Sequence, residues 1–190
     1  TCDLYLLAVG VNDYLNDRYD LRFARPDAEA FVEAVRKRGA GIFRQIVVEE
    51  VLDQDAVKGN VEAAFGRIAA KCRPEDAFIL YYSGHGAMSE PAEGAPADYY
   101  LVMSDVMQIY GGQGLAENGL SARRLTEECR QVKAQKMMVL LDSCASSAAL
   151  QEFATGGMAM AMAKGPEEEK AIAQLARSAG IMVLAACLTA

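Results

Sequence analysis

The sequence predicts an α/β fold, in which a mostly parallel central sheet carries helices on both faces. Two observations lead to this prediction. Short apolar runs at residues 4–10, 136–141 and 181–187 have the length and composition of strands that are buried on both sides. Segments with helical character separate these runs, and strands that alternate with helices form parallel βαβ units.

The first half of the chain supplies three of the five predicted strands. Pro26 favours the first turn of a helix, and Gly39 suits its end. β-Branched residues alternate in the segment that follows, as in a strand. The elements predicted here are strands at residues 4–10, 44–52 and 76–83, with helices at residues 26–38 and from 53 or 55 to 72.

The second half of the chain completes the predicted sheet. Ser121 is a good helix cap, and Gly180 ends the last helix. Residues 87–97 are rich in Pro, Gly, Ala and Glu, which predicts an exposed loop. The remaining predicted elements are a short strand at residues 99–103, helices at residues 121–133 and 167–179, and strands at residues 136–141 and 181–187.

Composition and charge limit the kinds of protein that this chain can be. A length of 190 residues predicts one domain, residues 1–190, with a substantial core. The net charge of −7 argues against a nucleic-acid partner and favours cationic substrates. Five irregularly spaced cysteines indicate reduced thiols in the cytoplasm, and neither a disulfide framework nor a zinc site.

The two ends of the sequence carry further information. No signal peptide is visible, and the apolar last ten residues are too short to cross a bilayer, so we expect no membrane partner. The chain begins at Thr1 instead of Met and ends on or just after a predicted strand. We therefore expect a fragment of a longer protein.

A histidine and a cysteine each follow a predicted strand. His85, the only histidine, comes directly after residues 76–83, and Cys144 comes just after residues 136–141. Neighbouring parallel strands end at the same rim of a sheet, where α/β folds bind ligands. A nearby imidazole converts a thiol into the nucleophilic thiolate. Taken singly, each residue is more often structural, but as a pair they predict a catalytic Cys/His site.

The motifs around this pair resemble those of caspase/metacaspase cysteine peptidases. YSGHG at residues 82–86 and DSCAS at residues 142–146 look like the two catalytic signatures, with the histidine first. Further similarity at residues 6–14, 21–28 and 98–105 extends the resemblance over nearly the whole chain. The resemblance implies a caspase-haemoglobinase fold with strand order 2-1-3-4-5-6, of which the sixth strand is apparently absent.

The same resemblance implies a reaction and its residues. Cys144 would be the nucleophile of a cysteine endopeptidase, and His85 its general base and acid. The backbone amides of Gly86 and Cys144 would form the oxyanion hole. No side chain in the sequence identifies itself as the group that orients His85, and a backbone carbonyl is the alternative.

The predicted specificity depends on two aspartates. In metacaspases, residues that match Asp27, Ser83 and Asp142 line the S1 pocket. Two carboxylates there would bind Arg or Lys and reject Asp, so we predict cleavage after basic residues. Asp27 also suits the start of a helix, and Asp142 an ion pair. Arg22 and Arg25 keep an Asp-specific, caspase-like pocket as the alternative.

The segment after the cysteine departs from the family pattern and suggests regulation. Ala145-Ser146-Ser147 stands where metacaspases commonly have His-Ser-Gly. Residues 153–165 include an alternating Met-Ala run that ends at Lys164. This segment is either an apolar or helical packing element, or an activation linker in which Lys164 is an autoprocessing site of a bacterial zymogen.

No cofactor or metal site is predicted. Some metacaspases need calcium, but the acidic candidates lack EF-hand spacing; they are Glu90, Glu93, Asp98 and Asp105. The expected partners are a peptide with a basic residue before the scissile bond and a regulatory domain or activating protein. A catalytically silent interaction module, a small-molecule hydrolase and a separase- or gingipain-like relative remain the alternatives.

Overall fold

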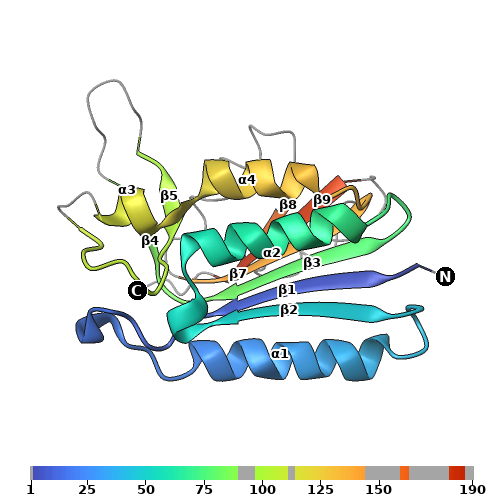
Figure 1. Cartoon of the computed structure of the whole chain (residues 1–190), viewed down its shortest axis with the longest axis horizontal. Helices are drawn as coiled ribbons and strands as arrows, with labels where there is room; N and C mark the ends of the chain where they lie inside the picture. Colours follow the sequence, from blue (N-terminus) through green and yellow to red (C-terminus); the bar gives the residue numbers. More distant parts are fainter. Residues whose placement is uncertain (1, 90–96, 111–113, 144–158, 163–179, 187–190) are drawn as a thin grey trace.

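A computed structural model describes residues 2–89, 97–110 and 114–143, together with the backbone of residues 159–162 and 180–186. These residues form one central sheet with helices on both faces (Figure 1). Cys144, Lys164 and the predicted helix at residues 167–179 lie outside the described residues.

The central sheet has six strands in the order β2-β1-β3-β7-β9-β8, and all neighbouring pairs are parallel. Its strands are β1 (Leu4–Gly10), β2 (Ile46–Leu52), β3 (Ala77–Ser83), β7 (Lys136–Asp142), β8 (Ala159–Met162) and β9 (Gly180–Ala186). The predicted α/β class is confirmed, and the five predicted strands follow one another in the predicted order. The implied order 2-1-3-4-5-6 differs at one edge, because β8 precedes β9 in the chain but lies outside it in the sheet.

The edge strand β8 corrects one detail of the prediction. The sequence predicts no sixth strand and makes this Met-Ala segment an apolar or helical packing element or an activation linker. Instead, residues 159–162 pair in parallel with residues 182–185 of β9. Ala and Met favour helix when isolated. The unpaired backbone groups at the edge of β9 can outweigh that preference, because they offer a strand its hydrogen bonds.

Helices cover the two faces of the sheet separately. Helix α1 (Ala24–Gly39) lies on one face, and α2 (Lys58–Lys71) and α4 (Ala122–Gln131) lie on the other (Figure 1). The other helical elements among the described residues are η1 (Asp17–Tyr19), η2 (Asp53–Asp55) and α3 (Gly114–Asn118). Ser121 caps α4 as predicted, since its hydroxyl accepts a hydrogen bond from the Arg124 amide.

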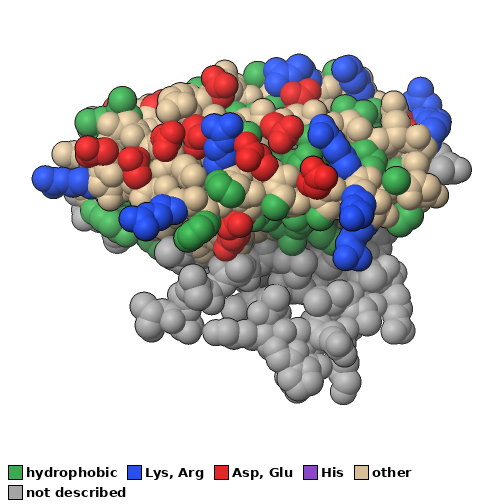
Figure 2. Space-filling view, turned by 90° about the horizontal axis from the view of Figure 1, so that it is seen from below, with side chains coloured by type: hydrophobic (Ala, Val, Ile, Leu, Met, Phe, Trp, Pro, Cys, Tyr) green, Lys and Arg blue, Asp and Glu red, His purple; other side chains and the backbone are tan. Residues whose placement is uncertain are grey.

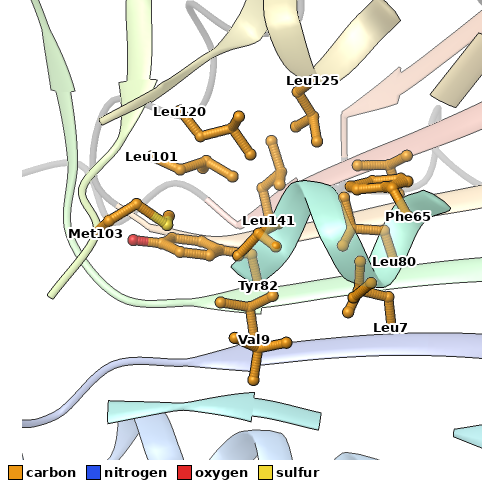
Figure 3. Close-up of a cluster of buried hydrophobic side chains, with 14 of the residues drawn as sticks. Leu7, Val9, Phe65, Leu80, Tyr82, Leu101, Met103, Leu120, Leu125 and Leu141 are labelled. Atoms are coloured by element: carbon orange, nitrogen blue, oxygen red, sulfur yellow. The ribbon is translucent and has the colours of Figure 1, made fainter. Parts of the chain in front are cut away.

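The core explains why β1 is apolar throughout. Leu6 and Ala8 pack against Val32 on the α1 side, whereas Leu7 and Val9 face the α2 side. Figure 3 shows the larger cluster, in which side chains of β1, β3 and β7 meet those of α2 and α4. Each such side chain contributes roughly 1.5–3 kcal/mol when fully buried.

Close packing brings the start of α1 to the carboxyl end of β1. A Cβ atom on Gly10 would lie 2.8 Å from the Ala28 Cβ and 2.9 Å from the Ala24 carbonyl oxygen. Glycine at this position therefore lets the first turn of α1 reach the rim of the sheet.

The outer surface seen from below carries interspersed acidic and basic side chains (Figure 2).

A small antiparallel sheet extends the same rim. It consists of β4 (Gly86–Met88), β5 (Tyr99–Leu101) and β6 (Leu120–Ser121). Residues 87 and 88 therefore continue as a strand, although they were predicted to start a loop. In the part of the chain that the structure describes, no helix is long and apolar enough to cross a membrane.

Candidate active site

The predicted histidine and cysteine segments meet at the carboxyl ends of β3 and β7. These strands are neighbours, and Ser83 lies opposite Asp142 in their register. Just beyond, the Gly84 amide donates a hydrogen bond of 3.3 Å to the Asp142 carbonyl. The turn that carries His85 therefore contacts the last residues before Cys144, whose own position is not described.

A cavity of about 230 Å³ lies at this rim. His85 and the three predicted pocket residues Asp27, Ser83 and Asp142 all line it. The other described residues that line it are Leu21, Arg22, Phe23, Ala24, Gly84 and Ser143. The structure thus brings together residues from β3, β7 and the first turn of α1 that are far apart in the sequence.

A backbone carbonyl holds the imidazole of His85. Its Nε2 atom lies 2.7 Å from the Tyr19 carbonyl oxygen. A carbonyl can only accept a hydrogen bond, so Nε2 carries the proton, and Nδ1 of the neutral ring is left as the acceptor. The rings of Tyr14 and Tyr19 flank the imidazole, with centroids 5.2 and 6.2 Å away.

The backbone of His85 is held as firmly as its ring. The His85 amide donates to the Tyr14 hydroxyl at 3.0 Å. The His85 carbonyl accepts from the Tyr82 hydroxyl at 2.7 Å and from the Val102 amide at 2.9 Å. Because C=O and N–H of a trans peptide point in opposite directions, the Gly86 N–H is directed away from β5.

Burial makes the two supporting tyrosines poor acids. It raises the pKa of Tyr14 to about 12 and that of Tyr82 well above its usual value. Both hydroxyls therefore stay protonated around neutral pH. Sequence reasoning gave these residues no role, although Tyr82 opens the histidine motif and Tyr14 lies in the segment at residues 6–14 that resembles the family.

The cavity concentrates negative charge. The pKa of Asp142 is raised first by partial burial and then by the charge of Asp27. Burial, followed by the charge of Asp142, raises the pKa of Tyr81 to about 12. Asp142 forms no ion pair with any described residue. A cationic ligand would relieve the repulsion between the two carboxylates.

The two arginines that would favour an Asp-specific pocket differ in position. Arg22 lines the cavity. Arg25 instead pairs with Asp53 at 2.8 Å and with Glu29 at 2.9 Å. Of the two, only Arg22 therefore lines the cavity.

The residue before the predicted nucleophile is anchored. The Ser143 hydroxyl lies 2.6 Å from the Tyr99 hydroxyl, and both side chains are buried.

Two other thiols are unsuited to nucleophilic chemistry, because burial raises the pKa of Cys72 to about 11 and that of Cys129 to about 12.

The described residues show no group of three or more side chains that could hold a metal ion. Asp98 lies 3.9 Å from the Arg123 guanidinium, and Glu90 and Glu93 are outside the described residues. Calcium binding by this chain stays a hypothesis.

A comparison with protein families decides the identity of this fold. The family model of the caspase domain matches residues 5–189.

The chain belongs to the caspase domain family.

This membership confirms the resemblance inferred from the two motifs.

A solved structure has a similar fold. It is the crystal structure of a Geobacter sulfurreducens protein that is 21% identical in sequence, with a TM-score of 0.57. The match covers 82% of this chain and 56% of that protein, so the chain spans just over half of the other's length. At this identity the likeness concerns the fold alone. No curated protein matches the chain.

Proposed function

We propose that this caspase domain is a cysteine endopeptidase in which Cys144 attacks the peptide and His85 moves the protons. One observation carries the proposal. His85 is held by the Tyr19 carbonyl in the tautomer that leaves Nδ1 as a base, and it lines a cavity with Asp27 and Asp142. Such an oriented base beside a ligand cavity is what a thiol nucleophile requires.

The reaction follows from this tautomer. Nδ1 of His85 takes the Cys144 thiol proton, and the thiolate adds to the peptide carbonyl carbon. The amides of Gly86 and Cys144 donate to the oxyanion. The imidazolium then protonates the departing amine, and a thioester remains. Water, deprotonated by the same imidazole, hydrolyses the thioester and returns the thiol.

Cleavage after Arg or Lys is the specificity that the cavity favours. Asp27 and Asp142 would face the cationic head of such a side chain, and Ser83 can add a hydrogen bond. Arg22 could instead attract an acidic side chain, but it stands alone against two carboxylates. We therefore keep the Asp-specific pocket as the alternative.

Regulation by processing is part of the same proposal. Lys164 comes two residues after β8 in the sequence and is a basic residue of the kind that this enzyme would cut. The chain would then be a zymogen, which is activated by cleavage there or by contact with a regulatory domain or activating protein. Calcium is the one ion that we include in the test.

The test is hydrolysis of fluorogenic peptides ending in Arg, Lys or Asp by the wild type and by Cys144→Ala, with and without calcium. We expect cleavage after Arg or Lys that disappears in the variant. Intact masses of both samples would reveal processing at Lys164 in the wild type alone. Faster cleavage after Asp would reverse the specificity, and no cleavage under any condition would favour a silent interaction module.

A substitution at Gly84 tests the support of His85. A Cβ atom there would lie 2.6 Å from the Tyr82 hydroxyl and 2.9 Å from the Tyr14 hydroxyl, the two groups that bind the His85 backbone. We expect Gly84→Ala to lower kcat/KM by about 100-fold through misplacement of the base, and to lower the free energy of unfolding by about 1–3 kcal/mol.

The matched control is Gly66→Ala in α2, where a Cβ atom would meet nothing within 4 Å. That variant should keep its activity and gain about 0.5–1 kcal/mol of stability, since alanine is the better helix former. Wild-type activity in Gly84→Ala would contradict the assignment of this contact.

A further inference from the structure

The loop between β1 and α1 supplies the groups that hold His85 from one side. The Tyr14 hydroxyl accepts from the His85 amide, and the Tyr19 carbonyl accepts from Nε2. The same loop provides Leu21, Arg22 and Phe23 to the cavity wall, and Phe23 is 72% exposed. Any displacement of this loop would therefore also displace His85, because these hydrogen bonds join the two.

Asp53 fastens both ends of this loop. It is the first residue of η2, after β2, and only 3% of it is exposed. Its Oδ1 atom accepts hydrogen bonds from the amides of Asn12 at 2.9 Å and Asp13 at 3.3 Å. Its Oδ2 atom accepts from the guanidinium of Arg25 at 2.8 Å, in the first turn of α1.

The loop ends are also joined to each other. The Arg25 amide donates to the Asn12 side-chain oxygen at 3.0 Å, and the Leu21 amide donates to the Asn12 carbonyl at 2.8 Å. Inside the loop, the Tyr14 amide donates to the Asp20 carboxylate at 2.9 Å. Residues 12–25 thus form a loop closed at its base, and the Asp53 carboxylate is the buried charge at that closure.

The backbone of Asp53 is itself unusual. Its φ of 47° makes it the only non-glycine residue with positive φ in the described part of the chain. Such a conformation costs on the order of 1–3 kcal/mol and persists where the surroundings enforce it. Burial acts to raise the pKa of Asp53, but hydrogen bonds from Arg25 and the two amides outweigh it and lower the pKa. The carboxylate is therefore charged at neutral pH.

We propose that Asp53 is a positioning residue for His85. By clamping Asn12, Asp13 and Arg25 it sets the place of the Tyr19 carbonyl, which in turn selects the Nε2–H tautomer of the imidazole. Asp53 touches neither His85 nor the cavity, so its effect passes through the loop. The inference rests on the proposed function for its catalytic consequence only; the tautomer is a property of the folded chain.

The test uses the single histidine as a spectroscopic probe. In protein labelled with ¹⁵N in the histidine ring, only Nδ1 and Nε2 of His85 report, and their chemical shifts distinguish the tautomers. We would compare the wild type with Asp53→Ala, Asp53→Asn and Arg25→Gln, and measure kcat/KM on an Arg peptide with the same samples. Asparagine keeps an acceptor for the two amides and tolerates positive φ, so it secures a folded variant.

Asp3→Asn is the matched control. Asp3 is also 3% exposed and also binds an arginine, Arg44, at 2.6 Å, but it lies at the opposite end of β1. The chemical change is the same, and in both cases a buried carboxylate loses its pairing with a half-exposed arginine. An effect that is merely structural would appear equally in both aspartate variants.

We expect the Nε2–H tautomer in the wild type and in Asp3→Asn. Asp53→Ala should give mixed tautomers and a loss of kcat/KM on the order of 100-fold, as for a base misplaced by about 1 Å. Asp53→Asn and Arg25→Gln should show smaller changes in the same direction. Folded Asp53→Asn and Arg25→Gln with wild-type nitrogen shifts would overturn the inference. A third outcome is that the variants have altered nitrogen shifts but no sample, including the wild type, cleaves the peptide. This would reject the proposed function and keep the positioning role of Asp53.

Discussion

His85→Ala is expected to lower kcat/KM for peptide hydrolysis by about 10²–10⁴-fold, which is the usual contribution of a positioned general base. Without the imidazole, the group proposed to take the Cys144 proton is lost. The double variant with Cys144→Ala should be no less active than Cys144→Ala alone, because the two residues act as one unit. Initial rates on an Arg peptide provide the measurement.

His85→Gln separates catalysis from folding. A glutamine amide can still donate to the Tyr19 carbonyl, as Nε2 of His85 does, but it cannot act as a base. We therefore expect the activity of His85→Ala with a free energy of unfolding closer to that of the wild type. Retention of more than about a tenth of the wild-type rate in either variant would contradict the role of His85, given the size of general-base effects.

Asp142→Asn is expected to lower kcat/KM on Arg peptides by about 100-fold, which corresponds to roughly 2.7 kcal/mol. The reason is the loss of one of two carboxylates that would face the substrate cation. Asp27→Asn should act in the same direction. The matched control is Glu33→Gln, which removes an exposed charge from α1 at a position that does not line the cavity. Equal losses on Arg and Asp peptides would refute an acidic S1 pocket.

The pH dependence gives an independent check of Asp142. Its pKa is raised by burial and by Asp27, so it loses its charge at a higher pH than an ordinary aspartate. The KM for an Arg peptide should therefore increase as the pH falls through that raised pKa. Since the folded-state pKa lies above the unfolded value, the contribution of this group to stability is present at low pH and is lost as the pH rises through it. Asp142→Asn should accordingly be no less stable than the wild type at neutral pH.

Much of the architecture was predictable because it depends on local patterns. Apolar runs such as residues 4–10 must be buried on both faces, which requires a parallel sheet with helices on each side. From that topology alone, the turn with His85 and the strand that ends in Asp142 were expected at one rim. The structure confirms the fold and brings both residues to one cavity.

Other features had no signature in the sequence. The strand β8 forms on a Met-Ala segment because an adjacent strand edge supplies its partners, and edges exist only in the folded chain. The pairing of Arg25 with Asp53 depends on where β2 ends relative to α1, so the sequence left Arg25 as a candidate for the pocket.

The sequence by itself determined the order of the elements, the chemical groups at the rim and the family of the chain, since these depend on residue identity and spacing. Only the tertiary structure decided how His85 is oriented. The group that orients it is the carbonyl of Tyr19, and every residue has such a carbonyl. What distinguishes this one is its position in space, which the folded loop between Asn12 and Arg25 and the buried charge of Asp53 establish together.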